Sequence, residues 1–402
     1  MKTSLILIFI PLCIFIHNNG VNAFTPPPRA EQAAILINNR IYFNGGWNGT
    51  YVSDFFYLDV SGPFTTASMN WTDLSSIPGR IMRAFSTACI SEINKGQIIY
   101  FSGGAIAVGD NFTSIFDTKT QQWITPKTSG NFTAVVRKSA QCIASGNEIY
   151  IYGGYDDLFN MIKLDALNLK WSTYYPGFIA PIGLLGYSAT LLNNASILYM
   201  GGKLHQGSFV DLSYILMDKT TSGSIPYSRC DHGSVYIPQY NQILIFYGYP
   251  DSSFIALDTL NFVWSYPTIL NNGGSPYQLI RFTSILIGAY ILIAFGNDHI
   301  SDNLTNDVLL LDVSQKDNYK WSTSYDPTKR FQSISTTTPI MSPTSNISHD
   351  SLSVNIGAII GGIFGGIAGL IILSTAAVIA IKRYGNPPLF TSEEVTSNQP
   401  ES

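Results

Sequence analysis

The sequence predicts an all-β protein, a six-bladed β-propeller of four-stranded units, followed by one C-terminal transmembrane helix. Two observations predict the propeller. An apolar strand that ends in glycine returns six times, and a strand that ends in aspartate returns with it at the same spacing. The third observation, an uncharged apolar stretch at residues 356–381, predicts the helix. Aromatic residues make up 13% of the chain, which suits strands because such side chains pack well on a pleated surface.

The glycine-ending strand sets the period of the repeat. Four copies end in a glycine pair, namely Gly45 and Gly46, Gly103 and Gly104, Gly153 and Gly154, and Gly201 and Gly202. The fifth and sixth copies keep a single glycine, Gly248 and Gly296. Glycine lets the chain leave a strand with dihedral angles that other residues rarely adopt. We therefore expect a tight turn at the end of each of these strands.

The second recurring strand carries an aspartate that we expect to cap the following turn. Its copies end at Asp59, Asp117, Asp165, Asp218, Asp258 and Asp312. A tryptophan follows in all units but the fourth, at Trp71, Trp123, Trp171, Trp264 and Trp321. We expect each to pack as a plate between neighbouring units. One unit cannot bury both of its faces, so the units must stack in a ring. The ring closes by packing of the first and last blades, or with a strand from residues 24–30 or 328–338.

The glycine pair, the aromatic strand with its aspartate and the spaced tryptophan together resemble kelch repeats of about 50 residues, over residues 28–326. In some kelch propellers an arginine near the start of the innermost strand lines the channel mouth and grips acidic peptides. The resemblance thus implies a ligand face formed by Arg29, Arg83, Arg137, Arg229 and Arg281, with Gly186-Tyr187 in that place in the fourth unit. The alternative is structural: each arginine pairs with carboxylates or turn carbonyls of its neighbours.

The two ends predict a type I membrane topology. Residues 1–23 carry the features of a signal peptide, with an uncleaved anchor as the alternative. The ectodomain would then span residues 24–326, a Ser/Thr/Pro-rich stalk 327–355, the membrane helix 356–381 and a tail 382–402. Lys382 and Arg383 predict that the tail is cytoplasmic. The expected location is the cell surface or a membrane of the secretory pathway, with the propeller outside.

Two further patterns fit that topology. Seven N-glycosylation sequons lie on the expected outer side, at Asn48, Asn70, Asn111, Asn131, Asn194, Asn303 and Asn346. Glycines at steps of four in the apolar stretch would let a second helix approach closely, and they predict a homodimer through Gly357, Gly361, Gly365 and Gly369. The alternative is that glycine is simply frequent in membrane helices.

Composition and motifs argue against catalysis. Hydrolase, phosphate-loop and zinc-protease motifs are absent, so we predict no catalytic residue and no cofactor. Among kelch-like proteins, galactose oxidase-like enzymes hold copper, but His205, His232 and His299 show no metal-ligand spacing, and we predict no metal site. The cysteines of the mature chain, Cys89, Cys142 and Cys230, allow at most one internal disulfide.

The sequence therefore predicts a recognition module. Its propeller would bind a protein or glycan partner, and the apolar stretch would contact the lipid bilayer. A net charge of −4 gives no sign of nucleic-acid binding. The alternatives are a surface-anchored copper oxidase and a structural wall or coat glycoprotein.

Overall fold

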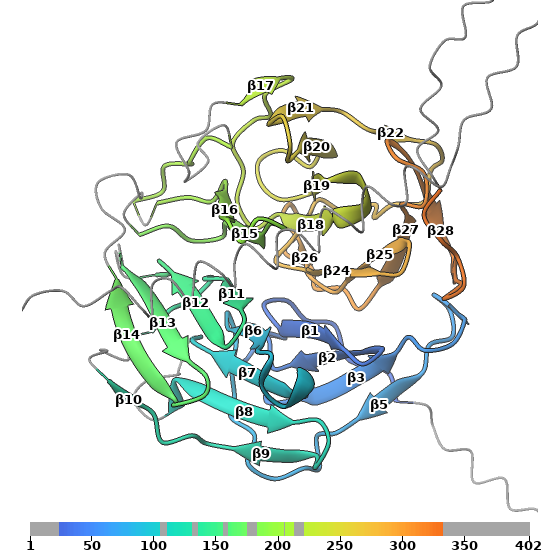
Figure 1. Ribbon diagram of the computed structural model, residues 1–402. Coiled ribbons are helices and arrows are strands. Elements are labelled where there is room, and N and C mark those ends of the chain that lie inside the picture. Colours follow the sequence, from blue (N-terminus) through green and yellow to red (C-terminus); the bar gives the residue numbers. More distant parts are fainter. Residues whose placement is uncertain are drawn as a thin grey trace, which may run out of the picture. The chain divides into compact units, whose positions relative to one another are not determined.

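The computed structural model describes residues 24–104, 111–130, 136–155, 160–174, 183–204, 206–212 and 221–332. These residues form short antiparallel sheets arranged around a common centre (Figure 1). Successive side chains of each strand point to opposite faces of its sheet. The aromatic and β-branched residues of one sheet pack on those of the next.

Five repeat units form complete blades. The first contains β1 (Ala33–Ile37), β2 (Arg40–Asn44), β3 (Phe55–Asp59) and β5 (Trp71–Asp73), and the second contains β6 (Thr87–Ile90), β7 (Ile98–Ser102), β8 (Thr113–Asp117) and β9 (Gln122–Ile124). The third contains β11 (Cys142–Ser145), β12 (Glu148–Tyr152), β13 (Met161–Asp165) and β14 (Lys170–Tyr174). The fifth contains β18 (Gly233–Ile237), β19 (Gln242–Phe246), β20 (Ile255–Asp258) and β21 (Val263–Ser265). The sixth contains β24 (Thr283–Ile287), β25 (Tyr290–Ala294), β27 (Val308–Asp312) and β28 (Asn318–Ser322).

Linker residues add a fifth strand to three blades. Each is two residues long and pairs in parallel with the outermost strand of the blade that follows it. The pairs are β10 (Ser129–Gly130) with β14, β17 (Ser222–Gly223) with β21, and β22 (Thr268–Ile269) with β28. The linker β23 (Leu279–Ile280) pairs with β26 (Asn297–Asp298). Short 3₁₀ turns lie at Ile93–Lys95 and Pro238–Tyr240.

The prediction of six blades with a membrane helix is wrong for the part of the chain that the structure describes. These residues form five complete blades, and the fourth unit contributes the two-stranded sheet of β15 (Ser188–Leu191) and β16 (Ile197–Met200). The fourth unit lacks the tryptophan that packs the outer strand of the other units against a neighbour. Its sheet packs against the third blade through a cluster of Tyr152, Tyr187 and Tyr199. Across the described ranges, no helix is long and apolar enough to cross a bilayer.

The features predicted for the two ends of the sequence lie outside the described residues. This applies to the signal peptide at 1–23, the apolar stretch at 356–381 with its four-step glycines, the tail at 382–402, and most of the stalk. The first residues of the expected stalk do lie against the propeller. Phe331 packs edge-on against Tyr240 at 5.3 Å, and Gln332 N–H donates to the carbonyl of Ser314 at 2.8 Å. The compact unit therefore extends beyond residue 326.

The innermost strands β1, β6, β11, β15, β18 and β24 contact one another in that order, and β24 also contacts β1. They surround the centre of the ring in Figure 1. At the outer edge, β29 (Ser324–Tyr325) pairs antiparallel with β4 (Phe64–Thr65) of the first unit. The ring is thus closed by packing of the first and last units together with this short pairing.

The geometry of the turns explains why glycine recurs at the end of the second strand of each unit. Gly45 has a φ of 66°, and a Cβ atom there would lie 2.1 Å from the carbonyl oxygen of Arg83 in the next unit. Only glycine fits such a close approach of two backbones. In the units with a single glycine, Tyr247 and Phe295 occupy the place of the first glycine with positive φ values of 55° and 63°. These two units keep the turn geometry without the glycine pair.

The tryptophans of the outer strands pack between neighbouring units. Trp123 meets Phe55 of the first unit at 4.8 Å, Trp171 meets Phe112 of the second at 5.5 Å, and Trp321 meets Phe254 of the fifth at 5.9 Å. Trp71 lies 6.0 Å from Phe295 of the sixth unit, which is its neighbour in the closed ring. The aspartates cap turns in the five complete blades, where each Oδ1 accepts from the backbone N–H two residues later, at Asp59, Asp117, Asp165, Asp258 and Asp312.

Candidate functional site

Four of the five predicted arginines are buried inside their own blades. Arg29, Arg83, Arg137 and Arg229 are 0–2% exposed. In each, Nη1 donates to the carbonyl of the residue at the first glycine position, at Gly45 (3.0 Å), Gly103 (2.7 Å), Gly153 (2.6 Å) and Tyr247 (3.3 Å). Nη2 donates to the residues that lead into the third strand, at Asp54, Asn111, Asn160 and Asp251. Each guanidinium therefore ties together the two ends of the loop between the second and third strands.

Burial lowers the pKa of these guanidinium groups, to about 10 for Arg83 and Arg137, which have no carboxylate partner among the described residues. For Arg29 and Arg229, burial also lowers the pKa, and the carboxylates of Asp54 and Asp251 oppose it. All four remain cations at neutral pH. Their Nη1 and Nη2 groups donate to backbone and side-chain oxygens of the same blade, so the four arginines hold loops in place. This agrees with the structural alternative to a ligand face, except that the partners belong to the arginine's own blade.

A closed circle of backbone hydrogen bonds fixes the register of the units. The N–H at each second glycine position donates to the residue at the arginine position of the next unit. The pairs are Gly46 to Arg83, Gly104 to Arg137, Gly154 to Leu184, Gly202 to Arg229, Gly248 to Leu279, and Gly296 to Arg29. Leu184 and Leu279 thus take the arginine position in the fourth and sixth units. Arg281 lies two residues beyond it, so grouping it with the other four by sequence placed it in the wrong register.

Arg281 instead belongs to a second circle, which we call the mouth ring. Its members are Glu31, Phe85, Ser139, Gly186, Asp231 and Arg281, one from each unit. Each N–H donates to the carbonyl of the preceding member at 2.8–3.2 Å, and all six have positive φ values between 54° and 62°. Non-glycine residues adopt this conformation infrequently, and a closed circle of bonds overdetermines it here.

The charged members of the mouth ring form one cluster. Arg281 Nε lies 2.9 Å from Glu31 Oε1 and 3.3 Å from Asp231 Oδ2. The side chain of Arg281 is 36% exposed, whereas those of Glu31 and Asp231 are 10% and 9% exposed. Burial, followed by the charge of Asp231, raises the pKa of Glu31 to about 8, while Arg281 and Lys203 oppose the rise. Burial lowers the pKa of Arg281, but the two carboxylates outweigh it and the net direction is upward.

Inside the mouth ring, a polar cavity of about 260 Å³ lies between the innermost strands. Gln32 Nε2 donates to Thr283 Oγ1 at 2.7 Å, and His232 Nε2 lies 3.0 Å from Ser188 Oγ. Among the described residues, Gln32 Oε1, Ser86 Oγ and His232 Nδ1 are buried here without a hydrogen-bond partner. The channel is therefore able to hold small polar species, because buried polar atoms need partners.

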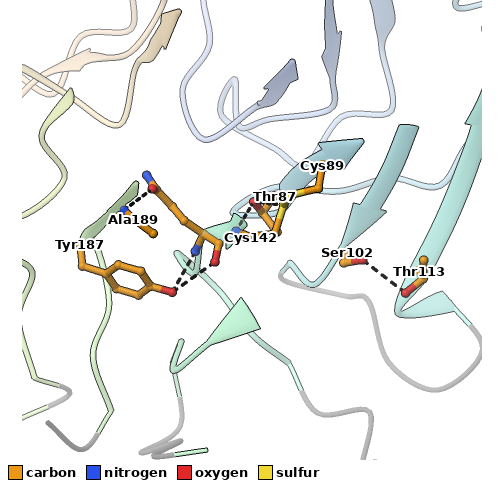
Figure 2. The surroundings of a disulfide bond; sticks show 8 residues. Thr87, Cys89, Ser102, Thr113, Cys142, Tyr187 and Ala189 are labelled. Atoms are coloured by element: carbon orange, nitrogen blue, oxygen red, sulfur yellow. Dashed lines mark hydrogen bonds between the residues drawn. A yellow bond between two sulfur atoms is a disulfide. The ribbon is translucent and has the colours of Figure 1, made fainter. Parts of the chain in front are cut away.

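A disulfide between Cys89 and Cys142 links the innermost strands β6 and β11 across the wall of this channel (Figure 2). Beside it, Thr87 Oγ1 accepts from the N–H of Cys142 at 2.9 Å. The remaining cysteine, Cys230, is a buried free thiol whose pKa is raised to about 12 by burial and by Asp231. The one internal disulfide that the cysteine count allows is thus present.

Exposed aromatic side chains surround the mouth ring. Trp47, Tyr155 and Tyr249 each follow the second glycine position directly and occupy equivalent places in the first, third and fifth units. All three are exposed. Tyr51 lies edge-on to Trp47 with ring centroids 5.2 Å apart, and the ring of His299 lies tilted against that of Tyr249 at 3.9 Å. We call the end of the propeller that carries the mouth ring and these residues the mouth face.

The aromatic residues of the mouth face were not predicted from the sequence. Their signal was present, because an aromatic residue directly after a glycine turn recurs in three units. Of the three histidines, His232 is buried with its pKa lowered to about 3 by burial and by Arg229, and His205 lies outside the described residues. Within the described ranges, no group of three or more His, Cys, Asp or Glu side chains is arranged to hold a metal ion.

Residues 16–202 match the family model described as the KLHDC2/KLHL20/DRC7 Kelch-repeats domain. The chain is 28% identical to Kelch domain-containing protein 3 of Homo sapiens over 159 residues, which is 36% of this chain and 41% of that protein. It is 22% identical to Acyl-CoA-binding domain-containing protein 4 of Arabidopsis thaliana over 329 residues, covering 75% of this chain and 48% of that protein. The chain spans about half the length of the curated relatives it matches, with shares of 41–51%.

A solved structure titled "Structure of YjhT" superimposes with a TM-score of 0.54 at 14% identity, over 74% of this chain and 98% of that one, and supports the fold alone. The matches confirm that the chain contains kelch repeats and forms a kelch propeller. Kelch propellers are generally protein-interaction modules, and kelch-domain proteins are generally not enzymes.

Proposed function

We propose that this chain is a recognition protein that binds a protein partner on the mouth face of its propeller. The observation that carries the proposal is the set of exposed aromatic side chains, Trp47, Tyr155 and Tyr249, at equivalent places around a charged ring. Tyrosine, tryptophan and arginine are the residues that contribute most to protein interfaces. The backbone N–H of each of the three aromatic residues donates to a carbonyl of the linker before its blade, at Ala30, Lys138 and Cys230, so little ordering of these positions is needed on binding.

The opposite face offers less. There the turns between the third and fourth strands expose Leu167 and Leu260, each at the tip of its turn. Single exposed apolar residues are common on protein surfaces and need no partner. On the mouth face Trp47 packs against Tyr51, and these two rings border a cavity, which is the arrangement expected of a binding surface.

We also propose that the propeller works in an oxidising compartment, on the outer side of the cell surface or in the lumen of the secretory pathway. The disulfide between Cys89 and Cys142 supports this, because such bonds persist in oxidising environments. Four sequon asparagines, Asn70, Asn111, Asn194 and Asn303, are exposed. Mass spectrometry of the native protein should find glycans on these sites, and a chain that carries none and has reduced cysteines would contradict the location.

The binding proposal is tested by photo-crosslinking in the cells that make the protein. The photoreactive residue benzoylphenylalanine replaces Tyr249 on the mouth face or, as the matched control, Leu260 on the opposite face, since both are exposed residues of the fifth unit. We expect crosslinks to a discrete protein from position 249 and none from position 260. Crosslinks from position 260 alone, or from neither position, would reject the mouth face as the binding surface.

A further inference from the structure

A cavity of about 460 Å³ opens beside the mouth ring, between the first and sixth units. We call it the Trp47 cavity. Its walls include Glu31, Trp47, Tyr51, Arg281, Asn297 and Asp302. It combines an aromatic wall, carboxylates and an amide, and it lies on the face that we propose binds the partner. The inference drawn from it rests on that proposed function and specifies its chemistry.

We propose that the Trp47 cavity takes a basic side chain, arginine or lysine, of the protein partner. This is the reverse of the acidic ligand that a ring of free arginines would select. Four of the five arginines expected on the ligand face are engaged in holding loops and are buried. The fifth, Arg281, is flanked by the carboxylates of Glu31 and Asp231 at 2.9 and 3.3 Å.

The charges that remain in the cavity favour a cation. Asp302 is exposed, and its Oδ1 accepts from Asn297 Nδ2 at 2.7 Å. In the part of the chain that the structure describes, no lysine or arginine pairs with Asp302. The positive charge of Arg281 is balanced by the carboxylate of Asp231, while Glu31 keeps its proton up to about pH 8, so the carboxylate of Asp302 is left to attract a ligand. A bound guanidinium or ammonium group would pair with it directly.

The aromatic wall is suited to the same ligand. The backbone of Trp47 bridges Ala30 on one side and Tyr51 on the other, and the indole lies edge-on to the ring of Tyr51 at 5.2 Å. The backbone N–H of Trp47 donates to the carbonyl of Ala30 at 2.7 Å, and the backbone carbonyl of Trp47 accepts from the N–H of Ala30 at 3.0 Å. Tryptophan is the best aromatic partner for a cation, and arginine is the cation found most often on it.

A buried acceptor gives a second, independent sign. Asn297 is 4% exposed and lines the cavity. Its Nδ2 is used by Asp302, whereas its Oδ1 has no hydrogen-bond partner among the described residues. A buried carbonyl oxygen without a donor is costly, and a guanidinium or ammonium group supplies donors only. A carboxylate ligand would add acceptor oxygens beside Asn297 Oδ1 and the carboxylate of Asp302, which need donors.

Asn48 lines the same cavity and begins a sequon, so a glycan there would cover the site. Every protein used in the test therefore carries Asn48→Gln. The probes are short peptides with blocked ends, Gly-Arg-Gly, Gly-citrulline-Gly and Gly-Glu-Gly. Citrulline has the shape of arginine without its charge. N-acetylglucosamine serves as the saccharide probe, because an aromatic wall with polar neighbours could also hold a sugar. Binding to the full chain is measured by ligand-observed NMR titration.

We expect the arginine peptide to bind at least tenfold more tightly than the citrulline and glutamate peptides, since its charge, donors and planar group are all used. Trp47→Ala and Asp302→Asn should each weaken its binding roughly three- to tenfold. Leu167→Ala is the control, because Leu167 is an exposed apolar residue on the opposite face, outside the Trp47 cavity, and it should leave the affinity unchanged.

Equal binding of arginine and citrulline, preference for glutamate, or no binding of any peptide would overturn the inference. Binding of N-acetylglucosamine alone, lost in Trp47→Ala, would make the cavity a saccharide site instead. None of these results bears on whether crosslinks form from position 249. A failure of the basic-residue site is therefore distinguishable from a failure of the mouth face as a binding surface.

Discussion

Replacing Arg83 with methionine removes a buried guanidinium while keeping most of the apolar stem. The group is 0% exposed and donates to the carbonyls of Gly103 at 2.7 Å, Phe112 at 3.1 Å and Asn111. Hydrogen bonds to a charged group contribute about 2 kcal/mol each, so three contribute about 6 kcal/mol. Burial lowers the pKa of Arg83 from 12.5 to about 10, which corresponds to a cost of about 3 kcal/mol for keeping the charge. The net loss in Arg83→Met is then on the order of 3 kcal/mol.

Urea and thermal unfolding of the full chain measure this loss. For a propeller of about 300 residues, the unfolding entropy converts about 3 kcal/mol into a fall in Tm of about 5 °C. Arg40→Met is the matched control, since Arg40 is 39% exposed and its ion pair with Asp59 spans 3.7 Å. It should cost less than about 1 kcal/mol. If Arg83→Met is as stable as Arg40→Met but loses partner binding, Arg83 belongs to the binding surface and the structural role assigned to it is wrong.

Three further predictions concern stability. Replacing Cys89 and Cys142 together with serine opens a loop closed over 53 residues and should cost about 2–4 kcal/mol in urea unfolding, with no loss if the bond does not form in solution. The folded protein keeps a proton on Glu31 that the unfolded chain releases between pH 4.5 and about 8, so stability should fall as pH rises through that window. Glu31→Gln should flatten this dependence in unfolding experiments at pH 5 and 8, and an unchanged slope would exclude Glu31 as its source. Tyr187 Oη donates to the carbonyl of Tyr152 at 2.5 Å, and Tyr187→Phe should lower the free energy of unfolding by about 1–2 kcal/mol in thermal unfolding. An unchanged stability would show that this hydrogen bond contributes nothing.

The repeat made the propeller predictable, because each recurring element has one mechanical role. The turn at Gly45, the cap at Asp59 and the plate at Trp123 are all recognisable from local spacing. The number of complete blades was not, because the fourth unit keeps its glycine pair while its described sheet has two strands. A glycine turn predicts the two inner strands that precede it, and it does not predict whether the outer strands of the same unit form.

The site was harder to predict, for a reason that Arg281 illustrates. Counting back from the glycine gave it the place of the four buried arginines, although the spacing varies from unit to unit. The backbone hydrogen bond from Gly248 shows that Leu279 holds that place. A shift of two residues moves a side chain from inside a blade to the mouth ring. Sequence spacing alone cannot resolve such a shift, because both positions lie on the same linker.

The charge of the mouth face was also misjudged for a physical reason. An arginine in a sequence has an obvious ligand, a carboxylate, whereas its intramolecular partners are backbone carbonyls that no sequence displays. Among the described residues Arg83 and Arg137 have no carboxylate partner, and their Nη1 and Nη2 groups donate to loop oxygens. In the mouth ring, Arg281 is likewise engaged by Glu31 and Asp231, so its guanidinium is not left free for an acidic ligand.

The proposed use of the mouth face is tested most directly by hydrogen–deuterium exchange of the full chain, alone and with the partner recovered by crosslinking. Binding on the mouth face predicts slower exchange in the loops that carry Trp47, Tyr155 and Tyr249, with unchanged exchange in the turns at Leu167 and Leu260. Protection of those opposite turns, with the mouth-face loops exchanging as in the free chain, would contradict it.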